Sequence, residues 1–149
     1  MNLEPIGIVR SPVREAVDEN WDSVVAEVHL APDLAAGLQG LEQFSHVVVV
    51  FLMHGASFDR AGDLVRRPQG LEDMPSLGIF AQRAKHRPNP IGITAVRLLG
   101  VAGNVLKVQG LDAIDGTPVL DIKPYFPAYD RVADAVVPEW VPRLMEGYF

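Results

Sequence analysis

The chain has 149 residues, 48% of them hydrophobic and 21% charged, which suits one domain with its own core and leaves no room for two sizeable cores. The absence of cysteine excludes disulfides, thiol catalysis, iron–sulfur clusters and cysteine-based zinc sites. The longest apolar run covers only residues 47–53, whereas a membrane-spanning helix needs ~20 residues, and charged residues near the start argue against a signal peptide. We therefore expect a single domain over residues 1–149, soluble and cytoplasmic.

Basic residues are concentrated in one part of this acidic chain. The formal net charge is −6, yet the window from Arg60 to Arg97 holds seven of the 13 basic residues and only three of the 19 acidic ones. Such a window indicates either a local anion-binding site or a solvated basic loop, and charge alone leaves both open. The overall negative field would repel nucleic acid.

Short segments bounded by proline and glycine are typical of strands. Residues 24–30 alternate between apolar and polar positions, which predicts a strand with one buried face. Residues 46–53 contain Val-Val-Val-Val-Phe-Leu-Met with no polar face, which predicts a strand that is covered on both sides or lines a closed barrel. Residues 94–98 and 105–109 flank Gly103-Asn104 and predict a hairpin. Further candidate strands cover residues 6–9, 78–81, 92–99 and 119–123.

Helix signals are few. Pro32 and Asp33 fit the first turn of a short helix, and the tail over residues 138–145 predicts another. Residues 58–75, rich in Arg, Asp, Gly and Pro, are expected to be a mobile loop. The fold is therefore expected to be mainly β, a closed or nearly closed β-barrel of about seven short strands with one or two short helices, because closure removes exposed strand edges.

Several familiar motifs are absent. No Gly-x-Gly-x-x-Gly dinucleotide fingerprint and no phosphate-binding Gly-Lys-Ser/Thr loop is present. The four histidines do not fall at helical i, i+4 spacing with a carboxylate, so we expect no metal.

Two proline-containing segments carry the chemistry. In residues 80–92, Pro88 and Pro90 fix two φ angles and keep the residues before them out of helix, so the chain is stiff where it enters a strand. This stiffness would hold Arg83, Arg87 and the Asn89 amide at a set separation, which suits a carboxylate or phosphate ligand. A rigid barrel corner with its arginines in water fits the same residues.

The second segment covers residues 110–125. Asp115-Gly116 predicts a tight turn, and Asp112 and Asp115 offer carboxylates to ribose hydroxyls or to a cation, although an ordinary turn also fits them. Asp121 and Lys123 share a strand face and predict an ion pair.

Together these segments resemble the TsaA/TrmO-like family, whose members carry Phe-Ala-x-Arg running into Arg-Pro-Asn-Pro-Ile-Gly and, downstream, Leu-Asp-x-x-Asp-Gly-Thr-Pro-Val-Leu-Asp-Ile-Lys-Pro-Tyr. Residues 6–12 and 40–46 are also similar to that family, and the resemblance covers about residues 5–129. It implies an S-adenosylmethionine-dependent methyltransferase built on a β-barrel and acting as a homodimer. The best known members methylate N6 of threonylcarbamoyladenosine at position 37 of tRNA.

The resemblance also implies site residues. The cofactor pocket of the family falls on Met53, His54, Arg83, Ile91, Gly92, Ile93, Asp112, Ile114, Asp115, Gly116 and Thr117. The isoleucines suit an adenine slot, the two aspartates suit the ribose hydroxyls and amino group, and Arg83 suits the cofactor carboxylate. His54 and Asp112 are candidate catalytic bases, and Arg66, Arg67, Arg87 and Asn89 are candidate substrate-binding residues for a threonylcarbamoyl carboxylate.

The chain departs from the family in two places near these residues. Ala84-Lys85 replaces the frequent Ser-Pro, and residues 18–22 replace a Pro-Arg-Gln loop that contributes to the cofactor site in many members. Trp21 either covers the cofactor or packs on the barrel rim. Two alternative functions stay open: methyl transfer from S-adenosylmethionine to a small metabolite or protein, and a non-catalytic S-adenosylmethionine-binding module.

Overall fold

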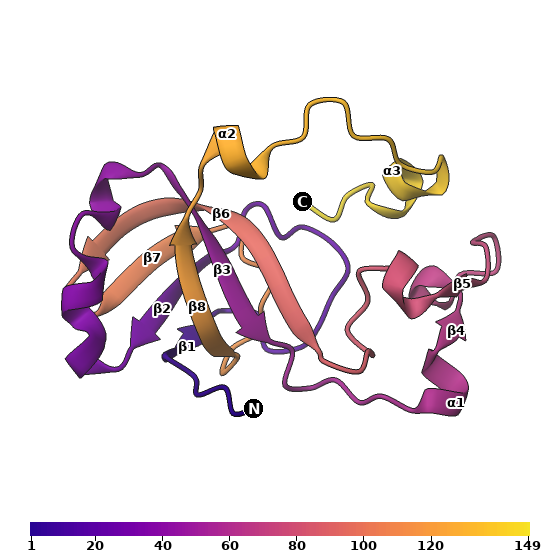
Figure 1. Ribbon diagram of the computed structural model, residues 1–149, viewed down its shortest axis with the longest axis horizontal. Coiled ribbons are helices and arrows are strands. Elements are labelled where there is room, and N and C mark those ends of the chain that lie inside the picture. The colour runs from indigo at the N-terminus through magenta and orange to yellow at the C-terminus, as the bar shows by residue number, and fades with distance from the viewer.

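A closed β-barrel dominates the computed structural model, which describes residues 1–149 (Figure 1). Around the barrel the strands follow the order β1-β2-β7-β6-β3-β8, and every hydrogen-bonded pair is antiparallel. The strands are β1 (Gly7–Arg10), β2 (Val25–Leu30), β3 (His46–Leu52), β6 (Ile91–Ala102), β7 (Val105–Gln109) and β8 (Pro118–Pro124). The predicted mainly β barrel is confirmed, with six strands rather than about seven.

The seventh predicted strand lies outside the barrel. Of residues 78–81, only Gly78 belongs to a strand, β5 (Leu77–Gly78), which pairs with β4 (Val65–Arg66). A 3-10 turn, Ile79–Ala81, follows directly. The Ile79 amide still donates to the Leu64 carbonyl at 3.0 Å, but residues 79–81 turn into the 3-10 helix, so the predicted strand over residues 78–81 is wrong in that part.

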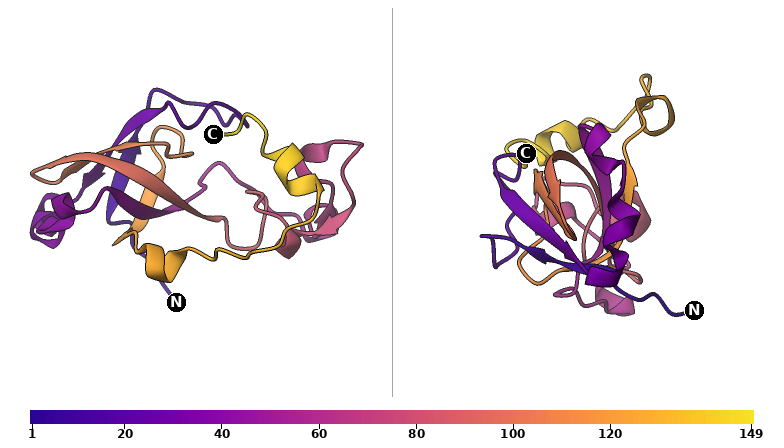
Figure 2. Two further views of the ribbon diagram at one scale, coloured as in Figure 1. Left: turned by 90° about the horizontal axis from the view of Figure 1, so that it is seen from above. Right: turned by 90° about the vertical axis from the view of Figure 1, so that its left-hand side faces the viewer.

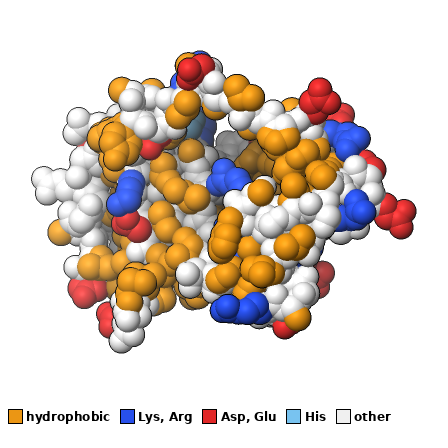
Figure 3. All heavy atoms as spheres, turned by 45° about the vertical axis from the view of Figure 1, so that its right-hand side comes forward, with side chains coloured by type: hydrophobic (Ala, Val, Ile, Leu, Met, Phe, Trp, Pro, Cys, Tyr) orange, Lys and Arg blue, Asp and Glu red, His pale blue; other side chains and the backbone are white.

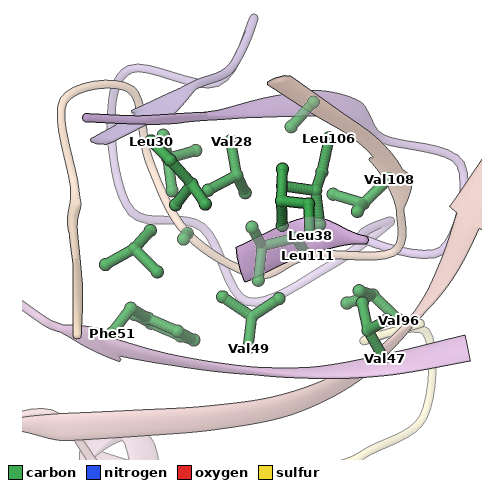
Figure 4. Packing of buried hydrophobic residues seen from close by; sticks show 14 residues of the cluster. Val28, Leu30, Leu38, Val47, Val49, Phe51, Val96, Leu106, Val108 and Leu111 are labelled. Atoms are coloured by element: carbon green, nitrogen blue, oxygen red, sulfur yellow. The ribbon is translucent and has the colours of Figure 1, made fainter. Parts of the chain in front are cut away.

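Strand β3 is the central strand that its apolar sequence predicts. It pairs with β6 on one side and with β8 on the other. Val47, Val49 and Phe51 alternate into the core cluster, while Val48 on the opposite face is only 9% exposed. Figure 4 shows these three side chains pointing toward Val28, Leu106 and Leu111 from the other side of the barrel. The outer face of β3 is therefore buried at Val48 and half-buried at Val50 and Leu52, which suits the apolar sequence that follows His46.

The predicted hairpin is also confirmed. Strands β6 and β7 pair from Arg97–Gln109 to Ala102–Val105, and Gly103 in the turn has a φ of 60°. The predicted ion pair is present on β8, with 2.6 Å between Lys123 Nζ and Asp121 Oδ2.

Helical segments are short and lie outside the strands. The predicted helix at Pro32 is a 3-10 helix, Pro32–Leu38, whose Leu38 reaches the barrel core, and a second 3-10 helix, Leu41–Gln43, follows. The tail contains α2 (Pro127–Asp130) and α3 (Trp140–Leu144), the latter within the predicted range. None of these helices is long and apolar enough to cross a lipid bilayer.

Residues 55–90 form what we call the side lobe, which stands at one end of the barrel with α3 beside it (Figures 1 and 2). It contains α1 (Arg60–Asp63), β4, the 3-10 helix Pro68–Gly70 and β5, around the buried Met74 and Ile79. The segment predicted as a loop over residues 58–75 thus contains two short helices and a strand, and its mobility stays a prediction. Its polar residues serve as caps, as where Asp59 Oδ2 accepts a hydrogen bond from the Gly62 amide at 2.9 Å.

Candidate functional site

Asp112 is the centre of the candidate site. It lies half-buried in the segment that joins β7 to β8. The Thr94 hydroxyl on β6 donates to Asp112 Oδ1 at 2.5 Å, and the Tyr148 hydroxyl in the C-terminal tail donates to Oδ2 at 2.5 Å. Three segments distant in sequence thus meet at one carboxylate. A carboxylate has about four lone-pair sites, so Asp112 can still accept hydrogen bonds from a ligand.

Arg83 joins the same place. Its Nη2 donates to the backbone oxygen of Ile93 at 2.8 Å, one residue before Thr94, while the side chain stays exposed. Burial, and then the negative charge and hydrogen bond of Asp112, raise the pKa of Tyr148 well above its ordinary value, and the charge of Arg83 opposes this shift. Arg83 and Asp112 are thus held by adjacent residues of β6, Ile93 and Thr94. The proline-stiffened segment and the aspartate-bearing segment converge.

The two isoleucines on β6 lie apart from this carboxylate. Ile91 and Ile93 are 39% and 52% exposed. Because side chains alternate along a strand, they project from the face of β6 opposite to Thr94. The strand therefore does not bring this part of the predicted adenine slot onto the Asp112 side, and the role of both residues stays a prediction.

Gly92 faces the opposite way from these isoleucines, into the barrel. A Cβ built at Gly92 would lie 2.4 Å from two ring carbons of Phe51, its partner across the β3–β6 pair. The structure thus gives Gly92 a packing role, whatever it contributes to a cofactor.

The turn at Asp115 holds the end of β1. Asp115 Oδ1 accepts from the Ser11 amide at 3.0 Å, and the Asp115 amide donates to the Val13 carbonyl at 2.7 Å. The Gly116 amide donates to the Val9 carbonyl, and the Thr117 side chain is buried, with 2% exposed. Gly116 has a φ of 82°, which confirms the predicted tight turn. Asp115, Gly116 and Thr117 thus have structural roles in this turn. Ile114 lies half-buried in the same turn.

The end of β3 carries the other predicted pocket residues. Met53 packs against the barrel core, and its amide donates to the Pro90 carbonyl at 2.8 Å. His54 is exposed in the following turn and is not hydrogen-bonded to Asp112. The two candidate bases therefore have different surroundings, one solvated and one held by two hydroxyls.

Trp21 packs inside the protein. It is 2% exposed, and its Nε1 donates to the Val17 carbonyl at 2.9 Å. This burial fits a packed side chain, and the covering of a cofactor by Trp21 stays a prediction. The Trp21 backbone also holds the C-terminal tail, since its amide donates to the Tyr148 carbonyl at 2.9 Å.

The arginines predicted for the substrate brace the side lobe. Arg66 pairs with Asp63 at 3.0 Å, Arg67 donates to the Glu72 and Met74 carbonyls, and Arg87 donates to the Gln82 carbonyl at 3.1 Å. Each guanidinium has five N–H donors, so part of each remains for a ligand. The exposed Asn89 lies between two prolines beside them.

A sizeable pocket lies elsewhere, between the start of β3 and α2. It has a volume of about 660 Å³ and is lined mainly by aromatic and apolar side chains, among them Phe44, Tyr125 and Phe126. Its polar side chains Ser45 and His46 hydrogen-bond to each other at 2.8 Å. We place the site at Asp112 instead, because adjacent residues of β6, Ile93 and Thr94, hold the guanidinium of Arg83 and the carboxylate of Asp112 that a charged ligand needs. No three His, Asp or Glu side chains gather as a metal-ligand set.

Figure 3 views the molecule with the side lobe brought forward. Hydrophobic side chains cover much of this face, a few basic ones stand among them, and a hollow opens near the top of the view. Apolar surface with isolated cations is compatible with an organic ligand that carries an anionic group.

Comparison with known proteins defines the class. A family model described as the N-terminal domain of tRNA-methyltransferase O matches residues 11–131. The chain belongs to this family of β-barrel proteins.

The relatives include enzymes and binding proteins. The chain is 41% identical over 144 residues to a tRNA (adenine(37)-N6)-methyltransferase of Escherichia coli, covering 89% of this chain and 61% of that protein. It is 39% identical over 136 residues to an S-adenosyl-L-methionine-binding protein of Archaeoglobus fulgidus, covering 89% of this chain and 94% of that protein. A crystal structure of TrmO from Pseudomonas aeruginosa superposes with a TM-score of 0.76 at 39% identity, covering 93% of this chain and 61% of that one. The chain thus spans about three fifths of the E. coli protein and of the solved structure.

Proposed function

We propose that this chain is an S-adenosylmethionine-dependent methyltransferase that methylates N6 of threonylcarbamoyladenosine at position 37 of tRNA, with residues 1–149 acting as one domain. The observation that carries the proposal is that Arg83 and Asp112, which come from the two segments that resemble the family most closely, are held by the adjacent residues Ile93 and Thr94 of β6. Membership of the family and the names of its relatives support the same reaction.

The residues present suit the cofactor. Asp112 offers an acceptor for ribose hydroxyls or an amino group, and its own hydroxyl donors keep it in place. Arg83 is exposed and uses one nitrogen on Ile93, so the rest of its planar fork is available to a carboxylate. When bound, S-adenosylmethionine supplies a methyl group on a positively charged sulfur.

The acceptor nitrogen needs help from the protein. An exocyclic amine is a poor nucleophile because its lone pair is delocalised, so the chain must orient it and take up its proton. We propose His54 and Asp112 as the candidate bases. His54 is exposed and thus open to an incoming nucleoside, whereas Asp112 already accepts two hydrogen bonds.

A homodimer in the cytoplasm, where transfer RNA and the cofactor are both available, forms part of the proposal. The outer face of β6 supports the dimer, because Ile91, Ile93 and Leu99 project from it with exposures of 39 to 52%. Rows of exposed aliphatic side chains on a strand face are typical of association surfaces. Sedimentation at several concentrations tests this part separately.

Methyl transfer from labelled cofactor tests the main proposal. The protein is incubated with tritiated S-adenosylmethionine and bulk tRNA, in parallel with tRNA that lacks threonylcarbamoyl. We expect label in the first sample and not in the second. Label in neither sample contradicts the proposed reaction.

A second candidate, transfer to a small acceptor, is favoured by two observations. The arginines of the side lobe, Arg66, Arg67 and Arg87, bind other groups of the protein, and the net charge is −6. Salt separates the two candidates. Binding to RNA through several phosphates weakens steeply with salt, whereas binding of a small acceptor responds little.

A further inference from the structure

The C-terminal tail is built into the candidate site. The Asn20 amide donates to the Gly147 carbonyl at 2.8 Å, and the Trp21 amide donates to the Tyr148 carbonyl at 2.9 Å. The views in Figures 1 and 2 place the C-terminus beside the segment between β1 and β2. Because Trp21 is itself buried, the tail rests on a fixed support.

This support aims one side chain at Asp112. The Tyr148 ring is half-buried, and Phe149 packs edge-on against it with ring centroids 4.8 Å apart. The hydroxyl then reaches Asp112 Oδ2 at 2.5 Å, a distance typical of a hydrogen bond to an ionised carboxylate. Thr94 holds the other oxygen at the same distance. Together the two hydroxyls leave the carboxylate one orientation.

We propose that Tyr148 is a positioning residue of the cofactor site, which sets the Asp112 carboxylate in the orientation that receives the cofactor. This inference rests on the proposed function, since it assumes that Asp112 contacts S-adenosylmethionine. It adds a residue that lies outside the segments resembling the family and outside the matched range 11–131.

Tyr148 acts by staying in place. Moving the tail away would break the backbone hydrogen bonds that Asn20 and Trp21 make to it. It would also expose the Tyr148 ring to water and disturb its contact with Phe149. The carboxylate does not require that release, because it retains lone pairs for the cofactor. The raised pKa of Tyr148 keeps the hydroxyl protonated, and therefore a donor, at neutral pH.

The test compares Tyr148→Phe with Tyr129→Phe in the full chain. Tyr129 is 86% exposed on α2, so this matched change removes a hydroxyl away from the site. Calorimetry with S-adenosylmethionine measures the Kd, and steady-state kinetics with tRNA separate the KM for the cofactor from kcat. We expect Tyr148→Phe to weaken the Kd about tenfold, the size of one hydrogen bond to a charged group, and to raise the cofactor KM more than it changes kcat. Tyr129→Phe should bind like the wild type.

The outcomes separate the inference from the function on which it rests. If the wild type binds no cofactor, the proposed function is wrong. If the wild type binds the cofactor and Tyr148→Phe has the same Kd, the positioning role is wrong. A lower Tm of the variant would then show only that Tyr148 stabilises the fold. A companion variant, Thr94→Val, removes the other donor, and the double variant should depart from the product of the two single effects by threefold or more, because both act on one carboxylate. Independent effects overturn the inference.

Discussion

Replacing Gly92 with alanine should destabilise the barrel through one contact. Gly92 on β6 lies opposite Phe51 on β3, and the aromatic ring covers the glycine. A Cβ at this position would lie 2.4 Å from Cε2 and Cζ of the ring, whereas carbon atoms in contact are about 3.5 to 4 Å apart. The ring must therefore move by about 1 Å, and it has little space for this because Phe51 is only 3% exposed.

The expected loss follows from overpacking. Extra methylene groups in a well-packed core cost about 1 to 3 kcal/mol. For a domain of this length each kcal/mol lowers Tm by about 2 to 4 °C, so Tm should fall by between about 2 and about 12 °C. Phe51→Leu shortens the side chain that causes the clash. The double variant should therefore be more stable than the sum of the single effects predicts, by about 1 kcal/mol or more.

Thermal and urea unfolding of four proteins measure this coupling. The matched control is Gly100→Ala on the same strand, where an added Cβ meets nothing within 4 Å. The reasoning is refuted if Gly92→Ala and Gly100→Ala have the same Tm, or if Phe51→Leu gives no relief in the double variant. Either result would mean that the β3–β6 pair is wider at this point than the structure has it.

Three further predictions concern charged groups and Tyr148. Arg83→Ala should weaken binding of S-adenosylmethionine by about tenfold or more, measured by calorimetry with the exposed Arg131→Ala as control; an unchanged Kd excludes the carboxylate-binding role. Tyr148, whose pKa is raised by burial and by the negative charge and hydrogen bond of Asp112, should ionise only as the protein unfolds. The stability that protonated Tyr148 contributes is fully present below the pKa of tyrosine in the unfolded chain and is lost as the pH rises above it. Comparing the phenolate absorbance of the wild type with that of Tyr148→Phe checks the assignment. The hydrogen bond from the Asp59 amide lowers the pKa of Asp63, so the stability that the ionised Asp63 contributes is present at neutral pH and lost in acid. The Tm of Asp63→Asn should therefore fall less steeply with acidification than the Tm of the wild type.

The barrel could be predicted because its strands and turns have recognisable local sequence patterns. The apolar run of β3 and the Gly103-Asn104 turn between β6 and β7 each need only neighbouring residues to be recognised. The side lobe could not be predicted in the same way. Its strands β4 and β5 have two residues each, and its interior depends on side chains that bond to loop carbonyls, such as Gln82 Nε2 to the Arg66 and Leu77 carbonyls. Such contacts have no period in the sequence.

The site was predictable only in part for a related reason. Arg83 and Asp112 stand in long motifs, so the resemblance locates them directly. Thr94 and Tyr148 reach Asp112 across 18 and 36 residues, and only closure of the barrel and return of the tail bring them there. The arginines of the basic window were predicted to face a ligand, but loop carbonyls such as those of Glu72 and Gln82 also attract guanidinium groups. Charge patterning does not distinguish these two uses of arginine.

The departure from the family at residues 18–22 and the contact made by the tail belong to one arrangement. Where many members have a Pro-Arg-Gln loop beside the cofactor, this chain has a segment in which Trp21 is buried and in which Asn20 and Trp21 use their amides to hold Gly147 and Tyr148. The segment thus contributes to the candidate site indirectly, through the residues that it holds. If Tyr148 sets Asp112 as we infer, this chain replaces a direct contact from the first loop with a contact from its last residues, and the cofactor meets the same carboxylate on a different support.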